Sequence, residues 1–184
     1  MNHQNTLSHD ILAATGVNSA RCYQCGKCSA GCPLAADMDF TSNTVMRMLQ
    51  VEDEQTDKDL LRSEAIWLCV SCEMCISRCP MAIDIPKVMD YLRQRSIREG
   101  LPNKHAKRNI IPFHRAFLDM IRFTGRSYEA GLVVDYKLRT KHFFQDLTLA
   151  PKMLLHGKLP LFPELIKQRN NIRRIFKKTQ NLPS

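Results

Sequence analysis

Apolar side chains recur at helical spacing in five segments of the 184-residue chain. Within each segment they return every three or four positions, which is the period of one face of an α-helix. Thr41 or Ser42 can cap the first helix, and Pro86 lies in the first turn of the third, which Gly100 follows. The predicted helices are residues 39–50, 58–68, 86–99, 112–124 and 164–178. We therefore expect a mainly α fold.

The segments between these helices have weaker patterns. Residues 1–20 are polar around one apolar turn at Ile11 and predict a short helix or an arm. Residues 52–57 are acidic and predict a solvated connection, whereas residues 132–136 are apolar but do not indicate a type of element. Residues 153–162 are apolar, interrupted by prolines and set among cations, which is typical of a docking surface.

Charge divides the chain into an acidic part and a basic part. Residues 1–103 carry 10 Lys and Arg against 13 Asp and Glu, a net charge of −3, whereas residues 104–184 carry 17 against 5, a net charge of +12. A basic tail favours acidic protein surfaces, anionic lipid or nucleic acid. The tail has no helix-turn-helix or glycine-aromatic signature, so we expect no nucleic-acid binding. A peripheral membrane contact stays open, because a basic amphipathic helix also permits one.

No stretch of the sequence predicts membrane insertion or export. A transmembrane helix needs about 18 to 20 consecutive apolar residues, and no such stretch occurs. The first 16 residues have neither a basic start nor a continuous apolar run, unlike a signal peptide. We expect a reducing cytoplasm, where thiols and iron–sulfur clusters persist.

Eight cysteines, all that the chain has, form two copies of one pattern 47 residues apart. In each copy three cysteines follow one another at every third position, and a fourth comes four residues later with a proline after it. The first run is Cys22, Cys25, Cys28 and Cys32, and the second is Cys69, Cys72, Cys75 and Cys79. The sequence therefore predicts an internal duplication.

This spacing is typical of two [4Fe–4S] clusters. Disulfide scaffolds occur in oxidising compartments and mostly in shorter chains, and zinc sites use isolated Cys-x-x-Cys pairs. In two-cluster ferredoxins the fourth cysteine of each run ligates the other cluster. We therefore predict Cys22, Cys25, Cys28 and Cys79 at cluster 1, and Cys69, Cys72, Cys75 and Cys32 at cluster 2.

The predicted organisation has three parts and no catalytic residue. An N-terminal arm (1–20) precedes a duplicated, bacterial-ferredoxin-like two-cluster α-helical domain (21–101), and a basic helical extension (102–184) docks to other subunits. The six histidines share no ligand-like spacing, and the chain has no glycine-rich phosphate loop or dinucleotide fingerprint. With all eight thiols assigned to clusters, we expect electron transfer without substrate chemistry.

Four segments of the chain resemble one family. They are the run Arg21 to Pro33, the run Trp67 to Pro80, the motif Thr124-Gly-Arg-Ser-Tyr-Glu129 and the motif Ala150-Pro-Lys-Met-Leu-Leu-His-Gly-Lys-Leu-Pro-Leu161. Together they are similar to the C-type subunit of heterodisulfide reductase. The cysteine runs are shared with many iron–sulfur subunits, so the tail motifs make the resemblance specific.

The resemblance implies a cytoplasmic complex of several subunits. A flavin-containing A-like subunit would feed electrons through this chain to a catalytic B-like subunit. In methanogens that subunit reduces the mixed disulfide of coenzymes M and B, and bacterial relatives act on other thiols or disulfides. An alternative is the iron–sulfur subunit of a dehydrogenase that delivers electrons toward quinone, such as a succinate or glycerol-3-phosphate dehydrogenase. A freely diffusing ferredoxin is disfavoured by the basic tail.

Overall fold

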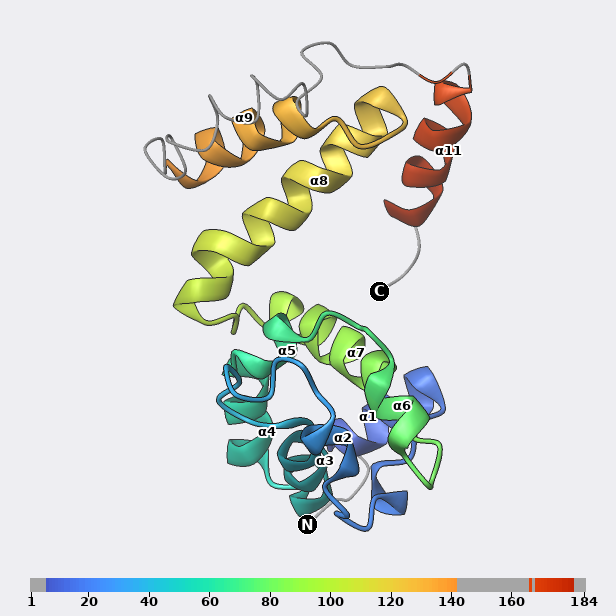
Figure 1. Cartoon of the computed structure of the whole chain (residues 1–184), viewed down its shortest axis with the longest axis vertical. Coiled ribbons are helices and arrows are strands. Elements are labelled where there is room, and N and C mark those ends of the chain that lie inside the picture. Colours follow the sequence, from blue (N-terminus) through green and yellow to red (C-terminus); the bar gives the residue numbers. More distant parts are fainter. Residues whose placement is uncertain (1–5, 142–165, 167, 181–184) are drawn as a thin grey trace. The chain divides into compact units, whose positions relative to one another are not determined.

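The computed structural model describes residues 6–141, 166 and 168–180, all of them helical or irregular, with no strand (Figure 1). The chain divides into two spatial units, Met1–Ala106 and Lys107–Ser184, which we call the head unit and the tail unit. The mainly α prediction is confirmed. The domain limits expected from the sequence stay a prediction, since spatial grouping alone does not show which segments fold independently.

The head unit consists of two series of short helices that follow the same order. The first series is α1 (Leu7–Thr15), the 3-10 turn η2 (Ser19–Arg21), α2 (Lys27–Ala30) and α3 (Ser42–Val51). The second is α4 (Glu54–Arg62), α5 (Ala65–Leu68), α6 (Met74–Arg78) and α7 (Ile85–Arg98). Helices α1 and α4 are both nine residues long and start 47 positions apart, the same offset as the cysteine runs. The duplication therefore covers the whole head unit.

The last helix of each series supplies the centre of the core. Helix α3 contains Val-Met-x-x-Leu at 45–49, and α7 contains the same pattern at 88–92. The apolar members of both patterns are 0% exposed: Val45, Met46, Leu49, Val88, Met89 and Leu92. Their spacing of one, three and four positions places them on one face of each helix. Burial of these two equivalent faces holds both series in one unit.

The two series interlock. Helix α1 packs against α7 of the other series, and α4 packs in the same way against α3. One hydrogen bond supports this exchange, since the Leu7 backbone N–H donates to Asp57 Oδ2 at 3.0 Å. Within the second series, the Ser96 hydroxyl on α7 donates to the Leu61 carbonyl on α4 at 2.7 Å. The core of the head unit is therefore built from both halves of the duplication.

The helix expected at residues 58–68 is in fact two helices, and the expected acidic connection is partly helical. Helix α4 begins at Glu54, because Asp53 caps it by accepting from the Thr56 N–H at 3.0 Å. A new helix, α5, starts after Ser63, where the carboxylate of Asp39 accepts from the N–H groups of Glu64 and Ala65, both at 2.8 Å. This second cap comes from 25 residues away, so local spacing could not predict it.

The tail unit contains α8 (Ile111–Thr124), α9 (Glu129–Thr140) and α11 (Arg169–Gln180), with a π-helical turn at Ala106–Ile110 leading into α8. Helices α8 and α9 pack through Phe113 and Tyr136, whose rings meet edge to face at 5.8 Å. Arg139 joins the same two helices, because it binds Asp119 at 2.8 Å and Asp135 at 2.9 Å.

Helix α9 settles the type of the apolar residues 132–136, which are helical. The basic helix expected at 164–178 is confirmed from residue 169 onward, where α11 (Arg169–Gln180) begins, while residues 164, 165 and 167 lie outside the described residues. The proline-interrupted segment 153–162 and the motif 150–161 lie outside the described residues. None of the helices in the described ranges has the length and apolarity that a bilayer crossing requires.

The repeated core makes a testable prediction on α7. Leu92→Ala should lower the free energy of unfolding by about 2–5 kcal/mol, because it leaves a cavity where Leu92 is fully buried. Ile97→Ala, on the same helix but 46% exposed, should change it by only about 0.5 kcal/mol. Guanidinium denaturation of the anaerobic, iron-loaded protein, followed by circular dichroism, compares the two. Equal losses would show that α7 does not pack in the core as described.

Candidate iron–sulfur centres

Two equivalent loops present the first three cysteines of each run. One loop leads from Cys22 into α2, and the other leads from Cys69 into α6. Positive φ values recur at the same two positions of each loop: Gln24 (61°) and Gly26 (74°) in the first, Ser71 (50°) and Glu73 (63°) in the second. Left-handed backbone is costly for residues other than glycine, so its repetition indicates that both loops are held on the same path.

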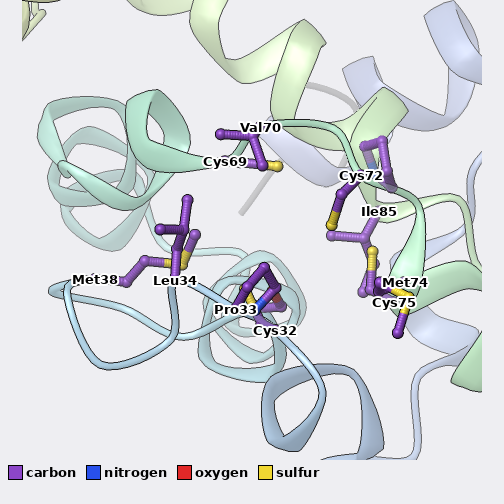
Figure 2. A pocket seen from close by; sticks show the side chains of 12 residues that line it. Cys32, Pro33, Leu34, Met38, Cys69, Val70, Cys72, Met74, Cys75 and Ile85 are labelled. Carbon is purple, nitrogen blue, oxygen red and sulfur yellow. The ribbon is translucent and has the colours of Figure 1, made fainter.

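One pocket combines cysteines from both runs. Cys69, Cys72 and Cys75 of the second run line it together with Cys32 of the first. Apolar side chains complete the wall, among them Leu34, Met38, Val70 and Ile85, and the pocket is partly open to solvent. Figure 2 shows the four cysteines around this one opening. The four residues predicted for cluster 2 are thus neighbours in the structure.

The last cysteine of the second run lies near the first run. The pKa of the Tyr23 hydroxyl is raised by desolvation first, then by a hydrogen bond with Cys25 and by the charges of Cys25, Cys79 and Cys22. Cys79 is therefore close enough to Tyr23 to act on it together with two cysteines of the other run. Its sulfur also accepts a hydrogen bond from the Ile83 N–H at 3.4 Å.

Helices α2 and α6, which precede the fourth cysteines of the two runs, pack against each other. A Cβ atom at Gly31 would lie 2.4 Å from Cδ and Nε of Arg78, so the absence of a side chain at Gly31 makes room for Arg78. These two residues hold equivalent positions in the duplication, 47 apart. Contact between equivalent positions is expected where an approximate two-fold axis passes between two repeats. Cys32 directly follows Gly31, and Cys79 directly follows Arg78.

The donor set suits iron rather than free thiols. All eight cysteines are unpaired with one another in disulfides. Burial raises the pKa of the Cys28 thiol, and burial followed by the charge of Cys69 raises the pKa of Cys75 to about 11. These two thiols hold their protons at neutral pH in the absence of metal, so binding iron as thiolates releases protons. Once such buried thiols ionise they need cations to neutralise them, and iron would supply that charge.

Each of the two cysteine loops is held by one long polar side chain, and the hydrogen bonds are equivalent in the two loops. Gln50, at the end of the buried pattern on α3, donates from Nε2 to the carbonyls of Ser19 at 2.9 Å and Cys22 at 2.7 Å. Arg93, at the corresponding place on α7, donates from Nε to the carbonyl of Ile66 and from Nη2 to that of Cys69. Ser19 and Ile66 are 47 residues apart, as are Cys22 and Cys69. Both loops are therefore held at equivalent carbonyls.

Sequence reasoning missed Gln50 and Arg93. A signal was present, since the segments Val45-Met-Arg-Met-Leu-Gln50 and Val88-Met-Asp-Tyr-Leu-Arg93 share the Val-Met-x-x-Leu pattern and end on a long polar side chain. Their offset is 43 rather than 47, because the connection from the fourth cysteine to the helix is four residues shorter in the second half. This change of offset hid the equivalence.

Within the described residues, no three His, Cys, Asp or Glu side chains converge on a point where a single metal ion could bind. Four of the cysteines instead line one larger pocket, namely Cys69, Cys72, Cys75 and Cys32.

Comparison with known proteins supports the same chemistry. A family model described as a 4Fe-4S dicluster domain matches residues 18–83. The C-type subunit of the ferredoxin:CoB-CoM heterodisulfide reductase of Methanosarcina mazei is 26% identical over 158 residues, 86% of this chain and 85% of that protein. The protein of the same description from Methanosarcina acetivorans is 36% identical over 96 residues, 52% of this chain but only 37% of that protein.

A third relative is the C-type subunit of the H(2):CoB-CoM heterodisulfide,ferredoxin reductase of Methanothermobacter thermautotrophicus. It is 27% identical over 126 residues, 67% of this chain and 61% of that protein. These similarities confirm the resemblance that the cysteine runs and the tail motifs indicated. The matched domain and the eight cysteines fit two [4Fe–4S] clusters, and the chain is an iron–sulfur subunit of the electron-transfer type.

The cluster content is open to direct measurement. Protein purified or reconstituted without oxygen should contain eight iron and eight sulfide, because two cubane clusters use all eight thiolates. Iron and acid-labile sulfide assays per chain measure this. Saturation at four iron, or a preference for zinc in competition, would contradict the assignment.

Proposed function

We propose that this chain, which belongs to the family of C-type subunits of heterodisulfide reductase, relays electrons from a flavin-containing subunit to a catalytic subunit that converts a disulfide or thiol. When bound, its two [4Fe–4S] clusters supply one-electron acceptor and donor chemistry. The observation that carries the proposal is the interlocked head unit, which brings eight thiolates into one helical unit. The names of the relatives make the CoB-CoM heterodisulfide one candidate substrate of the complex. We place this complex in the cytoplasm, where reduced thiols persist.

The two ligand sets that we propose cross between the runs. Cys22, Cys25, Cys28 and Cys79 hold cluster 1, and Cys69, Cys72, Cys75 and Cys32 hold cluster 2. The shared pocket supports the second set, and the joint action of Cys25, Cys79 and Cys22 on Tyr23 supports the first. Each cluster then bridges both halves of the duplication, which agrees with the exchange of helices in the core.

Both proposed centres reach the surface of the head unit. Cys25 and Cys72, the middle cysteines of the two runs, are exposed and equivalent in the duplication. An exposed apolar side chain lies two residues before each: Tyr23 is 59% exposed and Val70 is 64% exposed. A relay needs one accessible edge for the donor and another for the acceptor. These two edges are the proposed points of entry and exit.

Serine substitutions test the crossing. Cys32→Ser should alter the electron paramagnetic resonance signal of the cluster that Cys72→Ser alters, because both residues are in the proposed second set. Cys79→Ser should likewise match Cys25→Ser. Spectra of all four reduced variants provide the comparison. If Cys32→Ser matches Cys25→Ser instead, each run holds its own cluster and the crossing is wrong.

We propose that the tail unit docks the chain to its partner subunits. Its buried residues, among those described from 107 onward, are the small side chains Ala116, Thr124 and Thr140. By contrast, large apolar side chains on its helices are exposed, including Phe123 at 60%, Leu138 at 61% and Ile175 at 56%. The faces formed by such residues, together with the net charge of +12 in residues 104–184, suit an acidic protein surface with an apolar centre.

A truncation separates cluster binding from docking. A tagged chain that ends at Arg108 keeps all eight cysteines, so it should retain both clusters when purified anaerobically from its own cells. It should lose the flavin-containing and catalytic partners that the tagged full-length chain retains, as shown by flavin absorbance and disulfide reduction in the purified fraction. Retention of these partners at the full-length level would contradict the docking role of the tail.

Charge reversal tests the electrostatic part of docking without removing residues. Arg173→Glu with Arg174→Glu, both exposed on α11, should slow association with the partner subunits several-fold at low salt. The difference should shrink as salt rises, since screening weakens contacts between exposed charges. Arg62→Glu, exposed on α4 of the head unit, serves as the control and should leave the association rate near that of the wild type. Equal effects of tail and head variants would remove the specific role of α11.

A further inference from the structure

Gln50 and Arg93 hold equivalent cysteine loops through hydrogen bonds but differ in charge. Each side chain comes from the helix that follows its cysteine run, and each donates two hydrogen bonds to carbonyls at equivalent positions of the loop. One carbonyl in each pair belongs to the first cysteine of the run, Cys22 or Cys69. The neutral amide therefore lies at the first centre, and the guanidinium lies at the second.

We propose that Gln50 and Arg93 are matched positioning residues, and that the charge of Arg93 raises the reduction potential of the cluster at Cys69, Cys72 and Cys75 above that of the other cluster. The inference rests on the proposed ligand sets but on no partner subunit. Reduction adds one negative charge to a cluster, so a cation held nearby favours the reduced form, just as it favours an ionised carboxylate. Net charge, hydrogen bonds and solvent exposure are the terms that set cluster potentials.

Burial makes Arg93 more effective than the surface charges near either centre. Its side chain is 15% exposed, and it is bound directly to the carbonyl of a proposed ligand residue. Arg21 and Lys27 beside the first centre are exposed, and so are Glu73 beside the second and Arg78, which precedes Cys79 of the first set. Water and salt screen exposed charges strongly, whereas a partly buried charge is screened much less.

Three other contacts act against the effect of Arg93 and are weaker. Asp90 binds Arg93 Nη1 at 2.9 Å, but the Asp90 side chain is 54% exposed, so solvent weakens its field. At the first centre, Gln24 Nε2 donates to Cys22 Sγ at 3.3 Å, and the Ile83 N–H donates to Cys79 Sγ at 3.4 Å. These neutral donors also favour reduction, but hydrogen bonds from neutral groups are roughly half as strong as those that involve a full charge.

The test is a redox titration of the isolated, iron-loaded full-length chain, followed by electron paramagnetic resonance. Arg93→Gln gives the second centre a glutamine, as the first centre has in Gln50. The loop therefore keeps a hydrogen-bond donor while the positive charge is lost. We expect the midpoint potential of the second cluster, identified as the one whose signal Cys72→Ser alters, to fall. The midpoint potential of the first cluster, identified as the one whose signal Cys25→Ser alters, should stay the same. Arg93→Lys keeps the charge and should hold the midpoint close to that of the wild type.

A matched control removes one charge from the surface. Arg78→Gln, next to Cys79, should shift the midpoints less than Arg93→Gln, because Arg78 is exposed. Equal shifts in these two variants, or a shift of both clusters together in Arg93→Gln, would overturn the proposal. So would a wild-type protein in which the cluster at Cys69 has the lower potential.

A reciprocal variant covers the case in which Arg93→Gln does not load its second cluster. Gln50→Arg adds the charge at the first centre and should raise the midpoint of the cluster altered by Cys25→Ser; an unchanged midpoint would overturn the proposal. Iron and sulfide content show that each variant is loaded. An error in the proposed ligand sets is recognised by a separate experiment, the comparison of the four serine variants. In that case Cys32→Ser would alter the same cluster as Cys25→Ser, and this result does not depend on Arg93. If the chain proved not to relay electrons between the proposed partner subunits, the midpoint potentials measured on the isolated chain would be unaffected.

Discussion

The packing of each half of the duplication against the other is the constraint on which the head unit depends. Helix α1 packs against α7, and α4 packs against α3, so elements of both series help to cover the fully buried Val-Met-x-x-Leu faces of α3 and α7. The contact of α2 with α6, where Arg78 fills the space left by Gly31, belongs to the same arrangement. This arrangement brings the two cysteine loops together, and it places Cys32 of the first run in a pocket with Cys69, Cys72 and Cys75 of the second.

Duplication provides two similar sites, and small departures from symmetry let them differ. The loops share their positive φ positions, yet Gly26 in one corresponds to Glu73 in the other. The tie to the first cysteine is made by an amide in one half and by a guanidinium in the other. Such substitutions leave the backbone path unchanged while they alter the local charge. A protein that passes electrons between two centres can use a difference of this kind to give the transfer a direction.

The tail unit follows a different principle. Its helices are joined by a few specific contacts, such as the edge-to-face pair Phe113 and Tyr136 and the bridge from Arg139 to Asp119. Large apolar side chains remain exposed on all three of its described helices. A head that is held together by its own core and by clusters, joined to a tail with uncovered faces, suits a subunit whose stability and assembly depend on separate parts of the chain.

The sequence alone determined the cofactor, the duplication of the cysteine runs and most helices, because cluster ligation requires a fixed spacing of thiols and helices show their period locally. It also predicted the helices now seen as α7 and α8 closely, since proline, glycine and apolar spacing agree there. Only the tertiary structure decided the break between α4 and α5, where Asp39 caps a helix 25 residues away. It alone placed Gln50 and Arg93 on their loops. These features join positions distant in the chain, and the connection shortened by four residues removed the constant offset that would have shown them in the sequence.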